Sequence, residues 1–417
     1  MTRSRQEACL HQILTDLKQL QRRPWRSRML GLAIQERLIT LISNAERRIT
    51  ARRGKTKRAK QELANRVSKD EASRRKAEIG RASDAIGRDK ALIGLCRDIG
   101  DSIAFLYADR WDIKPLAQKE PPGDITNKKG ARLERAILRR LYNDGHSAVL
   151  NDLTGSLRHG DVTAFNRAGY FHIIEAKSGS GGNRHRAARQ QVNAQAILDY
   201  LARDEGVIMG QPLIRRSVGE RLIYHVRAIN RLFSLLKAHG EEAMREVEPG
   251  VFYCLLTDNP SGELIDKLSR PEGPVISLFA NDAKRQGLGY FPFPLIFDDP
   301  AHTLDFYLGR VVILISIDLY KVARLSGAAL RAEPGQNLDT PLIVFPPKEL
   351  GPSVPEYLAI GSHLFGRVGA EFLSPRSLIR MSEHRALLIA ADDLASSNQS
   401  SPNEGQVLGT SLDIGNV

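Results

Sequence analysis

A short apolar run that ends in two charged residues constrains this chain most. The segment Tyr170–Lys177 contains Ile173 and Ile174, followed by Glu175 and Lys177 two positions apart. Residues two apart in a β-strand project from the same face, so this carboxylate and this ammonium would share one side of a sheet. Charges at the end of a buried strand cost free energy unless they bind something. The run therefore predicts a strand that ends in a binding or catalytic site.

A second strand is expected directly before this one. The segment Asp161–Phe165 is separated from it by four residues that are typical of a hairpin loop. Pairing Phe165 with Tyr170 places Asp161 opposite Ile174, one residue from Glu175. Two carboxylates would then lie close together beside an ammonium, and like charges at short range favour a divalent cation between them. Oxygen ligands suit Mg²⁺ or Mn²⁺ better than zinc.

The surrounding pattern predicts the order helix, three strands, helix, strand. An amphipathic helix is expected at Gly130–Tyr142, followed by a short strand at Ser147–Leu150 and by the two strands already described. A helix from about Arg184 to Ala202 comes next, then a helix at about Glu220–His239 and a strand at Val251–Thr257.

At this point the sequence resembles the PD-(D/E)xK nuclease superfamily. The matching residues are Gly160-Asp161 and, about a dozen residues later, Glu175-Ala176-Lys177. Glu134, on the preceding helix, stands where many members carry an extra acid. The resemblance covers only about residues 130–257 and implies a restriction-endonuclease-like αβββαβ core that hydrolyses phosphodiesters with Mg²⁺. Gly160 replaces the proline that gives the family its name.

The resemblance also implies roles for single residues. Asp161, Glu175, Glu134 and the Ala176 carbonyl would hold Mg²⁺ or Mn²⁺. Lys177 would orient or deprotonate the attacking water. The remaining positions lie on the following helix, where Gln191 or Gln195 would position the scissile phosphate and Arg184, Arg186 and Arg189 would bind nucleic acid.

Several of these residues also have simpler interpretations. Glu134 is flanked by arginines and could be a solvated helix residue. Asp152 could cap a turn, or it could replace Glu134 as the accessory acid. Lys128 and Lys129 precede the first helix of the core, and the favoured interpretation is that they only solubilise a loop.

Residues 1–108 are predicted to be helical and basic. Leu10, Leu14 and Leu17 belong to one apolar stripe, and Gly54 is expected to divide two long helices into an antiparallel hairpin. The first hundred residues carry 25 Lys and Arg against 11 Asp and Glu, in a chain whose net charge is +13. This localised excess favours a polyanionic partner. The alternative is a solvated helix pair that only spaces domains.

The remaining regions are assigned from composition. Residues 109–129 read as a proline-containing linker, 130–260 as the nuclease-like domain, 261–394 as a mixed α/β extension and 395–417 as a disordered tail. Three strands are expected in the extension, at Pro274–Phe279, Arg310–Ile317 and Pro341–Phe345. Three widely spaced cysteines argue against a disulfide framework, and no apolar run is long enough for a membrane span.

The sequence therefore predicts a cytoplasmic, Mg²⁺- or Mn²⁺-dependent nuclease that needs no other cofactor. DNA is the expected partner, and restriction or defence against mobile elements is the expected setting by analogy. Two alternatives stay open. One is a non-catalytic DNA-binding or assembly subunit with the same fold. The other is a coiled-coil adaptor that forms a homodimer through the helical arm.

Overall fold

The computed structural model divides into two compact units. One comprises Met1–Arg215 with Tyr290–Leu308, and the other comprises Arg216–Gly289 with Gly309–Val417. The chain is a mixed α/β protein with long N-terminal helices and several antiparallel sheets, as predicted. The residues that the structure describes are 3–65, 67–117, 123–126, 128, 130–168, 171–176, 184–208, 210–214, 221–240, 242–257, 274–282, 291–326 and 330–397.

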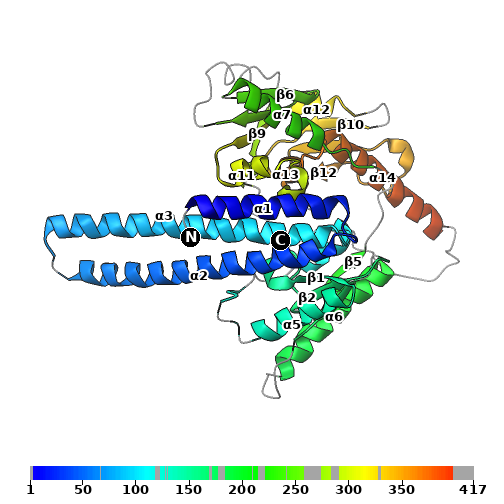
Figure 1. Cartoon of the computed structure of the whole chain (residues 1–417). Coiled ribbons are helices and arrows are strands. Elements are labelled where there is room, and N and C mark those ends of the chain that lie inside the picture. The colour runs from blue at the N-terminus through cyan, green and yellow to red at the C-terminus, as the bar shows by residue number, and fades with distance from the viewer. Residues whose placement is uncertain are drawn as a thin grey trace. The chain divides into compact units, whose positions relative to one another are not determined.

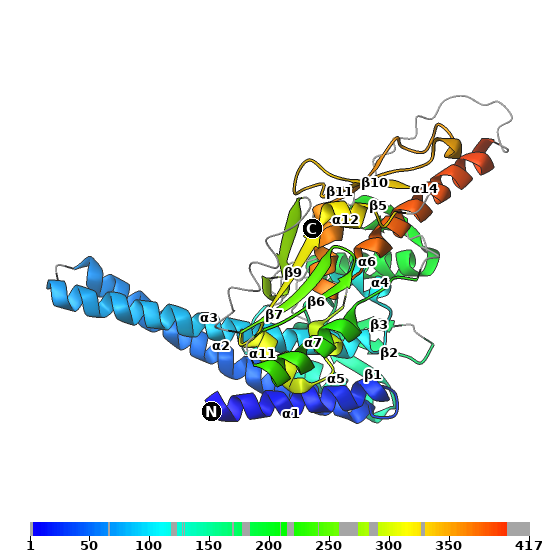
Figure 2. The same ribbon diagram turned by 90° about the horizontal axis from the view of Figure 1, so that it is seen from above.

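Three long helices begin the first unit: α1 (Arg3–Arg22), α2 (Arg28–Ala64) and α3 (Lys69–Phe105). Helices α2 and α3 lie side by side along their length (Figures 1 and 2). They are antiparallel, because Arg48 pairs with Asp89 whereas Glu62, further along α2, pairs with the earlier Arg75.

The hairpin was predicted correctly, but the prediction that Gly54 divides it was wrong. Helix α2 continues through Gly54, and the chain turns only between Ala64 and Lys69. A single glycine inside a helix costs only about 1 kcal/mol, which the rest of a long helix tolerates. The second helix starts with a proper cap, since the Ser68 side chain accepts a hydrogen bond from the backbone N–H of Glu71.

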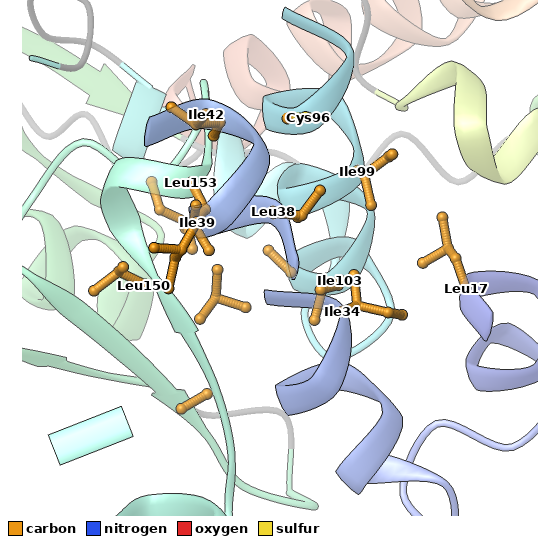
Figure 3. Packing of buried hydrophobic residues seen from close by; sticks show 14 of the residues in the cluster. Leu17, Ile34, Leu38, Ile39, Ile42, Cys96, Ile99, Ile103, Leu150 and Leu153 are labelled. Atoms are coloured by element: carbon orange, nitrogen blue, oxygen red, sulfur yellow. The ribbon is translucent and has the colours of Figure 1, made fainter. Parts of the chain in front are cut away.

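One hydrophobic core joins the helices to the following sheet (Figure 3). Leu17 of α1, Leu38 of α2 and Ile103 of α3 are all fully buried in this cluster, as the apolar stripes predicted. Leu150 and Leu153, which follow in the chain after a further helix, belong to the same cluster. The region predicted as an arm and the region predicted as a nuclease core are therefore packed together.

The first five predicted elements, a helix, three strands and a second helix, occur in the predicted order, whereas two strands that were not predicted follow the second helix. In chain order, the elements are α5 (Ala131–Asn143), β1 (Ser147–Leu150), the 3₁₀ turn η2 (Asn151–Leu153), β2 (Val162–Phe165), β3 (Phe171–Ile174), α6 (Arg184–Arg203), β4 (Glu205–Ile208) and β5 (Gln211–Ile214). Short helices α4 (Arg110–Ile113), α10 (Phe293–Ile296) and α11 (Pro300–Tyr307) and the 3₁₀ turn η1 (Lys114–Ala117) complete the unit.

The sheet is an antiparallel meander in the order β1-β2-β3. Its register differs by one residue from the prediction: Phe165 pairs with Phe171, and Val162 pairs with Ile174. Extending this register puts Asp161 opposite Glu175 rather than Ile174. Among the described residues, β4 pairs with β5 in a separate hairpin and does not extend this sheet.

Helix α2 covers the free edge of β1. The side-chain amide of Gln35 donates to the Ala148 carbonyl at 2.9 Å and accepts from the Leu150 N–H at 2.9 Å. The amide thus satisfies the two backbone groups that another strand would pair with. Gln35 is fully buried, so this contact joins the hairpin to the sheet without water.

The second unit contains two antiparallel sheets. The larger has the order β6-β7-β9-β8, and the smaller has the order β10-β11-β12. Their bounds are β6 (Glu242–Glu248), β7 (Val251–Leu256), β8 (Val275–Phe279), β9 (Val312–Asp318), β10 (Arg331–Pro334), β11 (Leu342–Phe345) and β12 (Leu358–Ile360). The helices are α7 (Val226–His239), α12 (Leu319–Ala323), α13 (Ser362–Glu371) and α14 (Pro375–Ser397), with the 3₁₀ turn η3 (Lys348–Leu350).

Four predicted strands of this unit are confirmed within one or two residues, as β7, β8, β9 and β11. The strand predicted at Val251–Thr257 pairs with β6 and β9, so it belongs to this sheet and not to the sheet of β1-β2-β3. Its apolar pattern marked it as a buried strand but did not identify its partners. Helix α14 runs to Ser397, so 395–397 are helical, and 398–417 lie outside the described residues. No helix among the described residues is both long and apolar enough to cross a membrane.

Candidate functional site

Three carboxylates meet at one ammonium beside the end of β2. The Lys128 Nζ lies 3.0 Å from Glu134, 2.8 Å from Asp152 and 2.8 Å from Asp161. Glu134 is buried, and the other three side chains are partly exposed. We call these four residues the acidic cluster. Its formal charge is negative, because three carboxylates surround one cation.

The charges of the cluster act strongly on one another. Burial by itself would lower the pKa of Lys128, but hydrogen bonds with Asp152 and Asp161 outweigh it and raise that pKa well above its usual value. Burial raises the pKa of Glu134, and the neighbouring carboxylates of Asp161 and Asp152 add to the increase, while Lys128 opposes it. Lys128 thus stays protonated, and the surroundings of Glu134 favour the protonated form of its carboxyl.

Asp161 is held from several sides. Its backbone N–H donates to the Ile174 carbonyl at 2.9 Å, and its own carbonyl accepts from the Asn151 N–H at 2.9 Å. Its second carboxylate oxygen accepts a hydrogen bond from the backbone N–H of Ala176 at 2.8 Å. The Asp161 side chain therefore accepts a hydrogen bond that a backbone carbonyl would accept if the β2–β3 pairing continued. This arrangement fixes one oxygen and leaves the other directed at Lys128.

Gly160 permits this arrangement. Its backbone has a φ of +73°, and a Cβ at this position would lie 2.4 Å from the Ile173 side chain. Proline fixes φ near about −65°, so it could not adopt this conformation. The backbone conformation before Asp161 therefore favours glycine and excludes proline.

Each helix of the hairpin fixes one of the loops that carry the cluster. Glu46 of α2 accepts hydrogen bonds from the backbone N–H groups of Ile125, at 3.0 Å, and Thr126, at 2.8 Å. The Thr126 hydroxyl donates to the same carboxylate. This contact holds the segment just before Lys128. Glu46 itself is buried.

Asp101 of α3 does the same for the loop between η2 and β2. Its carboxylate accepts from the N–H groups of Gly155 and Ser156, each at 2.9 Å, and from the Ser156 hydroxyl. Burial raises the pKa of Asp101, and these hydrogen bonds oppose the increase. The loop connects Asp152 to Asp161, so both acids depend on the helical hairpin for their position.

The negative charge of Asp152 affects the pKa of two arginines. Burial lowers the pKa of Arg97, on α3, and of Arg158, and Asp152 opposes the decrease in both cases. Arg97 also donates to the Gly123 carbonyl at 3.3 Å. Both guanidinium groups therefore interact electrostatically with Asp152.

The predicted site residues are brought together only in part. Glu134 and Asp161 meet as the resemblance implies, and Asp152 joins them, so the two acids considered as alternatives are both present. Glu175 and Ala176 follow β3, which ends at Ile174, so Glu175 is not within the strand as predicted; its side chain is exposed. Lys177 lies outside the described residues.

The residues predicted on the following helix are placed less fully. Gln195 is exposed on α6 and donates to Asp199 at 2.8 Å. Gln191, Arg184, Arg186 and Arg189 also lie on α6, but their side chains are outside the described part of the structure. Their predicted roles remain predictions.

Lys128 was not expected at the site, because the favoured interpretation of this lysine was that it only solubilises a loop. The available signal was its position shortly before the helix that carries Glu134, which is weak without the fold. Among the described residues, no group of three or more His, Cys, Asp and Glu is arranged to hold a metal ion by itself. In the acidic cluster, Lys128 takes the central position.

Comparisons of the chain with protein-family models, with curated proteins and with solved structures found no match. The resemblance to PD-(D/E)xK nucleases therefore rests on the residues quoted above, and the function it implies is a proposal.

Proposed function

We propose that this protein is a metal-dependent nuclease, with DNA as its substrate, and that the acidic cluster is the centre of its active site. The observation that supports this proposal is the meeting of Glu134, Asp152 and Asp161 around one point at the end of β2. Carboxylates repel one another, so this arrangement costs free energy unless a cation binds there. A role in restriction or defence is proposed by analogy alone.

The carboxylate oxygens are of the type that a hard divalent cation prefers, and the cation would have to displace the Lys128 ammonium from between them. The oxygens of Glu134 and Asp161 would hold it, with Asp152 as a third carboxylate and the exposed Glu175 nearby in the register. When bound, Mg²⁺ or Mn²⁺ would lower the pKa of a water molecule and stabilise negative charge on the phosphate. Asp161 is suited to a fixed ligand, because the Ala176 N–H holds its other oxygen.

The cations around the cluster have separate roles in this proposal. Lys128 would keep the carboxylates in place and offset negative charge that develops on the phosphate. Arg97 and Arg158, beside Asp152, would bind the phosphate of the substrate. Lys177 keeps its proposed role as the residue that orients the attacking water.

One observation favours the non-catalytic alternative. The ammonium of Lys128 already balances part of the negative charge and stands between the carboxylates. A cluster that is satisfied in this way could serve only to hold loops together. The protein would then bind nucleic acid without cutting it.

Cleavage assays with the purified full chain separate the two functions. Supercoiled plasmid, single-stranded DNA and RNA would be incubated with Mg²⁺, with Mn²⁺ or with EDTA. We expect cutting of DNA that requires the metal and is lost in Asp161→Asn and Lys177→Ala. Asp144→Asn is the matched control, because Asp144 is an exposed acid at the end of α5 that pairs with the exposed Arg140. The proposal would be contradicted if Asp161→Asn still cleaves DNA, or if the natural protein cleaves none of the substrates.

Lys128→Gln tests which lysine acts in the reaction. If Lys128 only balances charge, this variant should cut at a lower metal concentration, since three carboxylates without their ammonium attract a divalent cation more strongly. If it neutralises the developing charge on the phosphate, the rate at saturating metal should fall as well. Circular dichroism of each variant shows whether the fold is retained.

A further inference from the structure

The net charge of the chain is concentrated in the outer part of the helical hairpin. We call residues 47–64 of α2 and 69–90 of α3 the distal hairpin. The segment 47–90 contains 16 Lys and Arg against 6 Asp and Glu, in a chain whose total net charge is +13. Most of the excess therefore lies in about a tenth of the sequence.

Four of the six acids of the distal hairpin pair with a few arginines. Asp89 pairs with Arg48 and Arg52, and Glu62 pairs with Arg75. Glu71 pairs with Arg74 and Arg75, and Glu78 pairs with Arg75. Among the described residues, eleven further cations are exposed and have no acidic partner: Arg47, Arg53, Lys55, Lys57, Arg58, Lys60, Lys69, Lys76, Arg81, Arg88 and Lys90.

Packing against the rest of the protein does not explain why these cations are present. Of the described residues in the distal hairpin, only Ile49, Ala59 and Asp89 are buried. A groove of about 220 Å³ between the two helices is bordered by Arg52, Lys55 and Arg81. Placing so many like charges on a pair of helices destabilises it by repulsion, so a bound polyanion would stabilise the hairpin.

We propose that the distal hairpin binds the phosphate backbone of a nucleic-acid duplex next to the acidic cluster. This inference rests on the proposed function in taking the substrate to be nucleic acid, and it adds that the substrate must extend away from the cut. Residues 47–64 span about 27 Å at 1.5 Å per residue. That length corresponds to about 8 base pairs of duplex at 3.4 Å each.

The fold places this surface directly beyond the site. Glu46, which holds the segment before Lys128, is the residue immediately before the distal hairpin. Nucleic acid bound at the acidic cluster would therefore continue along α2. A helix pair is a straight, stiff element, and a duplex stays straight over the same length, so several phosphates can be contacted at once.

The test measures binding alone, with the full-length protein in EDTA and a fluorescently labelled duplex. The variant Arg53→Gln/Lys57→Gln/Lys60→Gln removes one stripe of exposed cations and keeps good helix formers. Arg22→Gln/Arg23→Gln/Arg26→Gln is the control, because it removes three exposed cations outside the distal hairpin. We expect the slope of log K against log salt to fall by up to about 2.7 in the first variant only, since each phosphate contact contributes about 0.9.

Duplex length provides the second measurement. Affinity should rise steeply between duplexes of about 6 and about 16 base pairs and level off beyond them. Equal salt slopes in the two triple variants, or affinity that does not depend on length, would overturn the inference, as would equal affinity for a flexible single strand. A change in molecular mass in the first variant would point instead to a dimer contact. Because no cleavage is needed, the outcome is independent of whether the acidic cluster is catalytic.

Discussion

The two ends of the helix pair formed by α2 and α3 differ in which side chains they bury and which they expose. At the proximal end, residues 28–46 of α2 and 91–105 of α3 contribute many buried apolar side chains to the core. Three of the polar side chains buried there, Gln35, Glu46 and Asp101, bind backbone groups of the sheet or of the segments that carry the acidic cluster. The distal hairpin buries almost nothing and exposes cations.

The difference shows how one motif can serve two purposes. Buried carboxylates at the proximal end are costly, and hydrogen bonds to otherwise unsatisfied N–H groups offset that cost. Exposed cations at the distal end cost little individually but repel one another. We therefore expect substitutions at the proximal end to change stability, and substitutions at the distal end to change binding.

The largest effect should come from Asp101→Ala. The variant removes the acceptor for two N–H groups and a hydroxyl in the loop between Asp152 and Asp161. Leaving these groups unsatisfied should lower the free energy of unfolding by about 4 kcal/mol, measured by urea denaturation. Asp84→Ala is the control, since Asp84 is an exposed acid on the distal part of the same helix. Similar losses in both variants would abolish the contrast between the two ends.

Gln35→Leu should have the next largest effect. Leucine keeps the volume of the side chain but leaves the Leu150 N–H, at the edge of β1, without its acceptor. We expect the free energy of unfolding to fall by about 3 kcal/mol, because a buried backbone N–H without an acceptor has lost its hydrogen bond to water and gained none. Gln61→Leu, at an exposed position of the distal hairpin, should change stability little. An increase in stability for Gln35→Leu would show that apolar packing alone can cover this edge.

The sequence predicted the elements well where the periodicity was strong. The leucine stripe of α1 and the apolar faces of α2 and α5 followed from the 3.6-residue period. The positions of β7, β8, β9 and β11 followed from short apolar runs. Pairing partners did not follow, because a strand's side-chain pattern does not specify its neighbour. Hence the register of β2 and β3 was wrong by one residue, and β7 was assigned to the wrong sheet.

The candidate site shows the same limit. Asp161 and Glu134 could be chosen because their spacing resembles a known pattern. Lys128, Glu46 and Asp101 could not, since each acts through a contact that only the folded chain creates. Single charged residues before or within a helix are usually solvated, so local sequence favours the wrong interpretation of all three.

The burial of one lysine on α1, outside the hairpin, gives the stability of the fold a pH dependence. Burial lowers the pKa of Lys18, on α1, to about 8, while Asp298 opposes the decrease. The folded state therefore releases this proton before the unfolded state does, and stability should rise between about pH 8 and the unfolded value near about 10.5. Below that window the buried charge destabilises the fold, by up to roughly 3 kcal/mol.

Lys18→Met should accordingly stabilise the protein at neutral pH. The difference in free energy of unfolding between the variant and the natural chain should be largest below about pH 8 and should vanish by about pH 10.5. Comparison at equal pH removes the contributions of other groups, among them Tyr142, whose pKa is raised by burial so that it titrates in this range only when the protein is unfolded. Lys57→Met, at an exposed position, controls for placing methionine in a helix. A constant difference across this range would show that Lys18 is not buried as a charge.

The smallest effect on stability should come from the triple variant of the distal hairpin, Arg53→Gln/Lys57→Gln/Lys60→Gln. None of the three cations has an acidic partner among the described residues, so their loss removes no ion pair. We expect the free energy of unfolding to change by no more than about 0.5 kcal/mol, and relief of repulsion favours an increase. If the variant instead unfolds easily, these cations stabilise the hairpin itself, and a loss of nucleic-acid binding could not be attributed to lost phosphate contacts. A stable variant that binds duplex weakly would show that the distal hairpin is a binding surface carried by a proximal end that holds the acidic cluster in place.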